Sequence, residues 1–302
     1  MTTTAAPPVH ILRVAWPRER VHSPSSLSLA RDCPRAWALC YVAKIRKPEL
    51  EWADIEAGRV KPQGGQRGAA LGKQVHAYAE LYCSGEGANQ IDWHGMPGRV
   101  LQSMLPHLPA SGSVPRSYIE RKFRVRVKGV AFRGVIDIDE AHAGVVRDHK
   151  TTRDIDAYAL TADTLPKDLQ ACLYVVDGER RAPDGADGLE CHWVYGETDD
   201  RKRRRSLPVI AHVTFAQARA VCEDAADFAR TLTYRRVLDA PANGMSCDNY
   251  GGCWYRREGH CRVPRPIGQM IVAHEKKEKE ANEKREVTRG TGVRKRGRGA
   301  RA

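Results

Sequence analysis

The chain has 302 residues, 41% of them hydrophobic, which is enough to form a hydrophobic core without disulfide support. Fifty Lys and Arg residues against 37 Asp and Glu residues give a net charge of +13, which favours a polyanionic partner such as nucleic acid. No stretch approaches the roughly 18 uncharged apolar residues of a membrane span, and the N-terminus lacks the order of a signal peptide, so we expect a cytoplasmic protein with no membrane partner.

The composition predicts three parts. Residues 1–22 form an N-terminal arm, residues 23–266 form one globular domain without internal repeats, and residues 267–302 form a charged tail. From Glu275 onward the tail contains 11 Lys or Arg residues, 5 Asp or Glu residues and almost no apolar residue. We therefore expect a mostly disordered basic tail, which either only keeps the protein in solution or also contacts phosphates.

Apolar periodicity and turn residues predict the elements of the domain. In chain order they are helices over 27–42 and 69–83, strands over 117–127, 130–139 and 144–150, a short helix over 166–177, strands over 189–196 and 207–213, and a long helix reaching Arg236. Thr214 and Gln217 have the spacing of a capping box at the start of that last helix. This order of elements is typical of an α/β fold with a mixed sheet.

Two of the expected strands end in carboxylates, in the stretches GVIDIDE and GVVRDHK. Asp137 lies on the first, Asp148 on the second, and Lys150 shares the face of Asp148 because it follows two residues later. Two converging carboxylates suit a hard divalent cation, and a nearby lysine can position the attacking water or offset charge on a phosphate. An Asp-x-Lys triplet is also common in surface turns and ordinary ion pairs, so the prediction depends on further motifs.

The order of these motifs resembles the RecB-like branch of the PD-(D/E)XK nuclease superfamily over roughly residues 23–261. LGKQVHAYAE resembles the helix with the metal-binding histidine, GVIDIDE and RDHKTT resemble the second and third motifs, and QACLY contains the Gln-x-x-x-Tyr pair. The resemblance implies a restriction-endonuclease-like core, in which helices flank a mixed central sheet. It implies metal ligands His76, Asp137 and Asp148, the catalytic lysine Lys150, and Gln170 and Tyr174 beside the active site and the DNA.

Each residue also has a simpler interpretation. His76 could be an ordinary helix histidine, Gln170 and Tyr174 could be neighbours on a helix surface, and Asp139 could replace Asp137 as the ligand. Glu120, in the phrase YIERKF, is a further candidate because many relatives carry a glutamate at the start of the first strand.

Four of the nine cysteines flank these motifs. Cys33 precedes them, and Cys247, Cys253 and Cys261 follow. This arrangement resembles the iron-sulfur staple of AddB and of the CRISPR-associated RecB-type nucleases, which implies a 4Fe-4S cluster. The spacing departs from the family pattern, so zinc and unliganded thiols remain alternatives. The other cysteines lie in apolar patterns and are expected in the core: Cys40, Cys83, Cys172, Cys191 and Cys222.

A basic loop is expected between the last two strands, and it either contacts phosphates or is a solvated hairpin: Arg201, Lys202, Arg203, Arg204 and Arg205. The resemblance implies a Mg²⁺- or Mn²⁺-dependent deoxyribonuclease, an exonuclease on DNA ends or single strands, in recombination, repair or related DNA processing. Such a protein, which could be phage-encoded, would act with a separate helicase or recombination protein. Two alternatives stay open: a non-catalytic, cluster-stapled DNA-binding subunit, and a zinc-stapled protein that binds RNA through its tail.

Overall fold

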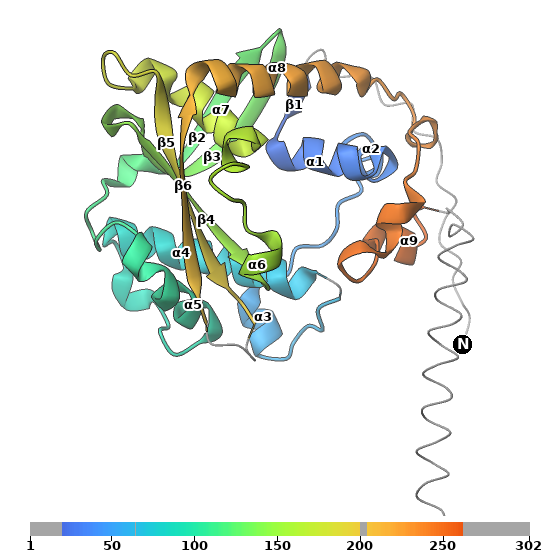
Figure 1. Cartoon of the computed structure of the whole chain (residues 1–302). Helices are drawn as coiled ribbons and strands as arrows, with labels where there is room; N and C mark the ends of the chain where they lie inside the picture. Colours follow the sequence, from blue (N-terminus) through green and yellow to red (C-terminus); the bar gives the residue numbers. More distant parts are fainter. Residues whose placement is uncertain (1–19, 64, 200–203, 262–302) are drawn as a thin grey trace, which may run out of the picture.

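A computed structural model describes residues 20–63, 65–199 and 204–261 and contains a mixed sheet flanked by helices (Figure 1). This confirms the predicted α/β class. Most of the predicted N-terminal arm and all of the predicted tail lie outside the described residues. Within those residues, no helix is both long and apolar enough to cross a lipid bilayer.

The sheet has six strands: β1 Val21–His22, β2 Ile119–Val127, β3 Val130–Glu140, β4 Val145–Thr152, β5 Gly188–Glu197 and β6 Ser206–Thr214. Their order is β1-β3-β4-β5-β6, in which β1 and β4 pair with different parts of one edge of β3. The opposite edge of β3 pairs with β2. The pairs β1–β3 and β4–β5 are parallel, and the remaining pairs are antiparallel.

The ladder between β3 and β4 is short. It runs from the pair Glu140–Val145 to the pair Ile138–Arg147, at the C-terminal end of β3. Near the N-terminal end of β3, the same edge of the strand pairs with β1 instead. The two strands therefore separate immediately beyond Ile138 and Arg147. We call this point the fork; the next residues along the two strands are Asp137 and Asp148.

Helices cover both faces of the sheet. The described α-helices are α1 Pro24–Asp32, α2 Pro34–Tyr41, α3 Trp52–Glu56, α4 Gln66–Ser84, α5 Met96–Met104, α6 Ile155–Tyr158, α7 Leu169–Gly178, α8 Phe215–Thr231 and α9 Trp254–Arg257. On β5, Val194 packs with α4 and α5, whereas Trp193 and Tyr195 pack in the larger core with α7 and α8. Successive side chains of a strand point to opposite faces, so α4 and α5 lie on one side of the sheet and α7 and α8 on the other.

Three helix predictions need correction, one because the helix is broken and two because an end is shifted. The single helix expected over 27–42 is wrong: Cys33 is extended and separates α1 from α2, because Pro34 lacks an N–H and disfavours the helical conformation of the residue before it. The helix expected over 166–177 begins at Leu169, where the Asp168 side chain caps it. The capping box of Thr214 and Gln217 is present, but its helix ends at Thr231 and not near Arg236.

Candidate metal and active site at the sheet fork

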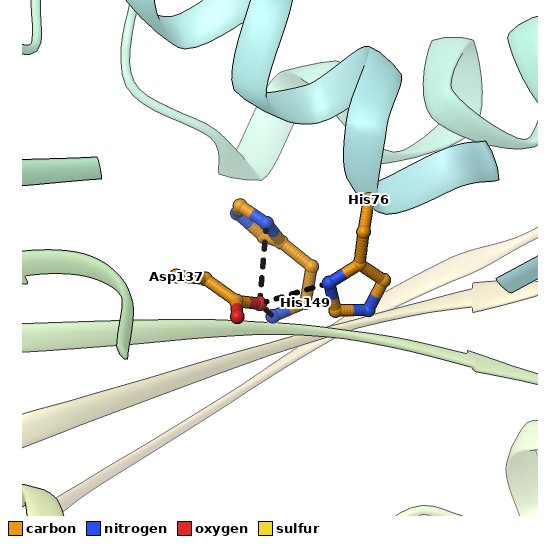
Figure 2. A group of neighbouring side chains, drawn as sticks. All are labelled: His76, Asp137 and His149. Carbon is orange, nitrogen blue, oxygen red and sulfur yellow. Dashed lines mark hydrogen bonds and ion pairs between the residues drawn. The ribbon is translucent and has the colours of Figure 1, made fainter. Parts of the chain in front are cut away.

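Three possible metal ligands converge at the fork: His76 from α4, Asp137 from β3 and His149 from β4 (Figure 2). Their ligand atoms all lie within 4.8 Å of one another. His76 Nδ1 is 3.3 Å and His149 Nδ1 is 3.6 Å from Asp137 Oδ2. The same carboxylate oxygen accepts a hydrogen bond of 2.7 Å from the His149 backbone N–H, so it occupies the place where the strand ladder would have continued.

A close approach of α4 to β4 brings His76 to the fork. A Cβ atom on Gly72 would lie only 2.7 Å from Thr151 Oγ1, so glycine allows the helix to approach the strand at this point. His76 follows Gly72 by about one helical turn and so lies on the same side of α4. Leu71, Val75 and Ala79 are buried along this helix and fix its rotation.

Replacing Gly72 with leucine is expected to move α4 away from β4 and to weaken Mn²⁺ binding by at least about tenfold, as is usual when the support of a metal ligand is disturbed. The matched control is Gly68→Leu, one turn earlier in the same helix, where a Cβ would meet nothing within 4 Å. Calorimetric titration of both variants with Mn²⁺ tests this. Equal affinities in the two variants would contradict the positioning role of Gly72.

A second group lies on the α7 side of the fork. The Lys150 ammonium is 2.5 Å from Asp148 Oδ2 and donates a hydrogen bond of 2.9 Å to Gln170 Oε1. The Gln170 amide nitrogen donates to Asp148 Oδ1 at 2.8 Å and to the Tyr174 hydroxyl at 2.5 Å. The glutamine thus holds the lysine with its oxygen and the carboxylate with its nitrogen, which fixes the position of both groups.

The Tyr174 hydroxyl also closes the inner edge of the fork. It lies 2.6 Å from the carbonyl oxygen of Val135 and 3.0 Å from Asp148 Oδ1, and can donate its single proton to either. Val135 belongs to the part of β3 that has no partner in β4, so a side chain takes over the hydrogen bond that the separated strand lacks.

Burial and charge act differently on the two aspartates. Burial, together with the negative charge of Asp137, raises the pKa of Asp148 to about 6 against the opposing effect of Lys150. Burial would also raise the pKa of Asp137, but the hydrogen bond and charge of His76 prevail and lower it to about 2. The Asp137 carboxylate is therefore ionised throughout the range near neutral pH.

The two histidines have opposite pKa shifts. Burial lowers the pKa of His149 to about 4, so its imidazole is neutral near pH 7 and has a lone pair for a metal. Burial also acts to lower the pKa of His76, but its contact with Asp137 outweighs this effect and raises it. A bound divalent cation would replace that proton.

Glu120 extends the acidic environment of the site. It has a left-handed backbone, with φ of 52°, where the β2–β3 ladder passes from the pair Ile119–Ile138 to the pair Arg121–Ile136. Burial, together with the charges of Asp137 and Glu80, raises its pKa to about 7. A strained non-glycine residue beside the proposed metal ligands makes Glu120 a candidate site residue.

The structure thus brings together all the residues predicted from the nuclease motifs. It groups His76 and Asp137 of the predicted ligand set with His149, which the sequence analysis missed, and turns the Asp148 carboxylate towards Lys150 and α7. The predicted role of Asp148 as a metal ligand stays a prediction. Asp139, the alternative ligand, is instead held by Arg121 and Arg181.

Only part of the predicted basic loop can be located. Arg201, Lys202 and Arg203 lie outside the described residues. The Arg205 guanidinium binds Glu197 at 3.1 Å and Asp156 at 2.8 Å, so it joins the start of β6 to α6. Arg204 is half-buried beside it. Phosphate contact by this loop stays a prediction.

The proposed cluster cysteines come from two distant parts of the chain. Asn243 links them, because its backbone N–H donates to Cys33 Sγ at 3.5 Å and its side chain donates to the carbonyl of Asp32 at 2.9 Å. Cys33, Cys253 and Cys261 pack around one small core of α2 and α9 residues. Burial raises the pKa of the Cys261 thiol, and the three other thiols of the set raise it further.

The remaining cysteines follow the predicted pattern with one exception. Cys40 is only half-buried and packs in the small core beside α9. The others are buried in the domain, as expected: Cys83, Cys172, Cys191 and Cys222.

Comparison with known proteins gives a matching family and several similar solved structures. The family described as the PD-(D/E)XK nuclease superfamily matches residues 21–261. No curated protein matches the chain. The crystal structure of a candidate exonuclease from Eubacterium rectale is similar at 11% identity and a TM-score of 0.46, over 83% of this chain and 92% of the other. That of the protein SSO0001 is similar at 13% identity and a TM-score of 0.35, over 83% and 91%.

Proposed function

This chain belongs to the PD-(D/E)XK nuclease superfamily, whose members hydrolyse nucleic acids with divalent metals, and we propose that it is a metal-dependent deoxyribonuclease. The observation that carries the proposal is the convergence of His76, Asp137 and His149 at the fork, with Asp148 and Lys150 on either side of His149 in β4. From the sequence resemblance we further propose an exonuclease that acts on DNA ends or single strands in recombination or repair, beside a separate helicase or recombination protein in the cytoplasm.

His76, Asp137 and His149 would hold the divalent ion. The His149 ring is buried, and within the described part of the chain neither of its nitrogens makes a hydrogen bond: Nε2 has no partner and Nδ1 is 3.6 Å from Asp137 Oδ2. An imidazole left unsatisfied in this way fits a metal ligand. Two imidazoles beside one carboxylate favour Mn²⁺ over Mg²⁺, which prefers oxygen ligands.

A divalent ion bound here would polarise the scissile phosphate and lower the pKa of a bound water molecule. Lys150 is the residue placed to act on the substrate, since its side chain keeps 32% of its surface exposed while Asp148 and Gln170 fix its ammonium group. From this position the ammonium can orient the attacking water and offset the charge that develops on the phosphate. Tyr174 is buried and Gln170 is half-buried, and both serve to hold Asp148 and Lys150 in place.

Incubation with end-labelled single-stranded and double-stranded DNA tests this function, in chelator, in Mg²⁺ and in Mn²⁺. We expect cleavage that requires a divalent ion and is faster with Mn²⁺. Products that shorten progressively from one labelled end identify an exonuclease. DNA binding without cleavage in any metal would instead support the non-catalytic DNA-binding subunit.

We also propose that Cys33, Cys247, Cys253 and Cys261 together hold a metal centre, either a 4Fe-4S cluster or zinc. What supports this is that the two ends of the domain are tied together around these thiols: Asn243 links Cys33 to the segment that contains Cys247, and the Cys253 backbone N–H donates to the Cys247 carbonyl at 2.7 Å. Thiolates suit either centre. Visible absorption and metal analysis of anaerobically purified protein distinguish the two.

A further inference from the structure

The β2–β3 hairpin has one face that α4 does not cover. The C-terminal part of α4 packs on the base of the hairpin, where Cys83 contacts Ile119 and Ile138. Further along β2, Phe123 packs edge-on against Tyr174 of α7, and Val125 and Val127 pack into the same core. The residues between them therefore point to the opposite face of the sheet, the one on the α4 side.

That face is strongly basic. Its exposed cations are Lys122, Arg124 and Arg126 of β2 and Arg133 of β3, which together we call the basic strip. Arg124 and Arg133 are directly paired across the two strands, so both side chains lie on the same face. The hairpin from residue 121 to residue 136 contains no Asp or Glu.

The basic strip starts at the fork. Lys122 of β2 pairs with Val135 of β3, whose carbonyl oxygen lies within hydrogen-bond distance of the Tyr174 hydroxyl. Two residues further along β3 is Asp137. Alternate residues of a strand are about 6.8 Å apart, so the β2 cations form a file that runs away from the proposed metal ligands. The β2 cations form a single row, and Arg133 lies on the neighbouring β-strand about 4.8 Å to the side. A row of this width can accommodate one phosphodiester backbone.

We propose that the basic strip binds the backbone of one DNA strand and guides it to the fork. This inference rests on the proposed nuclease function, for which it names the substrate-binding surface. Phosphate contacts of this kind hold a strand in register without reading its sequence. The strip would therefore act on DNA of any sequence, as a nuclease that works along a strand requires.

The test compares two triple variants of the full chain. Lys122→Gln, Arg124→Gln and Arg126→Gln together remove the β2 cations, and the matched control removes three exposed cations of the same types elsewhere, Lys61→Gln, Arg99→Gln and Arg180→Gln. Binding of a fluorescent single-stranded oligodeoxynucleotide is measured in chelator against salt concentration. Cleavage of the same oligonucleotide is then measured in Mn²⁺.

For the strip variant we expect at least about tenfold weaker binding and a salt slope smaller by about 2, since three phosphate contacts on a single strand contribute roughly 0.7 each. KM should rise by a similar factor while kcat at saturating DNA stays unchanged. The control should differ little from wild type. Unchanged slope and KM in the strip variant, with an active wild type, would overturn the strip alone, whereas a wild type that neither binds nor cleaves DNA would overturn the proposed function and the strip with it.

Discussion

Replacing Lys150 with glutamine is expected to lower the rate of DNA cleavage by at least about a hundredfold, because the charge that faces the reacting phosphate is lost. Glutamine can still donate a hydrogen bond to Asp148, so the hydrogen-bond network with Gln170 and Tyr174 keeps a donor at this position. DNA affinity in chelator should change little, since one contact among several is removed. The measurement is single-turnover cleavage of end-labelled DNA in Mn²⁺, with the melting temperature as a check on folding.

The control is Lys167→Gln, an exposed lysine in the short turn before α7. It removes the same charge without touching Asp148. A Lys150→Gln protein that is folded and cleaves at the wild-type rate would remove Lys150 from the active site, and equal losses in both variants would show that only net charge matters.

Loss of the thiol of Cys33 is expected to unfold or strongly destabilise the protein. Cys33 and Cys261 are more than two hundred residues apart, and a shared metal centre would close a loop around the whole domain. By analogy with a disulfide, closing a loop of that length contributes about 5 kcal/mol, similar to the entire stability of many domains. Cys33→Ala should therefore lower the melting temperature and remove the bound metal together.

Cys222→Ala is the matched control, because Cys222 is buried in α8 and lies outside the proposed ligand set. It should keep its metal content and most of its stability. Both variants are purified anaerobically, and their metal content, visible spectra and melting curves are compared. Identical behaviour of the two proteins would contradict the staple and leave all these cysteines as ordinary packing residues.

Much of the candidate site could be predicted from local sequence. Asp148 and Lys150 share a face because they are two residues apart in a strand, and Gln170 and Tyr174 share a helix face because they are four apart. His149 could not be predicted in this way. Strand alternation places it opposite to Asp148, and it meets Asp137 and His76 only because β3 and β4 separate at the fork, which depends on the register between strands.

The same distinction applies to the fold. Capping residues at Thr214 and Gln217 are local and gave the start of α8 correctly, and the Pro34 break between α1 and α2 was readable from the sequence but overlooked. The role of Gly72 was not readable, because a glycine inside a helix reveals its purpose only when the neighbouring strand is known. Which face of the hairpin stays uncovered likewise depends on how far α4 reaches across the sheet.

The proposed function requires that the fork between β3 and β4 binds the divalent ion used for cleavage. Calorimetric titration of Mn²⁺ into wild-type protein and into Asp137→Asn tests it most directly, since Asp137 is the carboxylate that both histidines approach. We expect one Mn²⁺ site in this region, weakened by more than about a hundredfold in the variant, with cleavage lost in parallel. A folded Asp137→Asn protein that binds Mn²⁺ as tightly as wild type would contradict it.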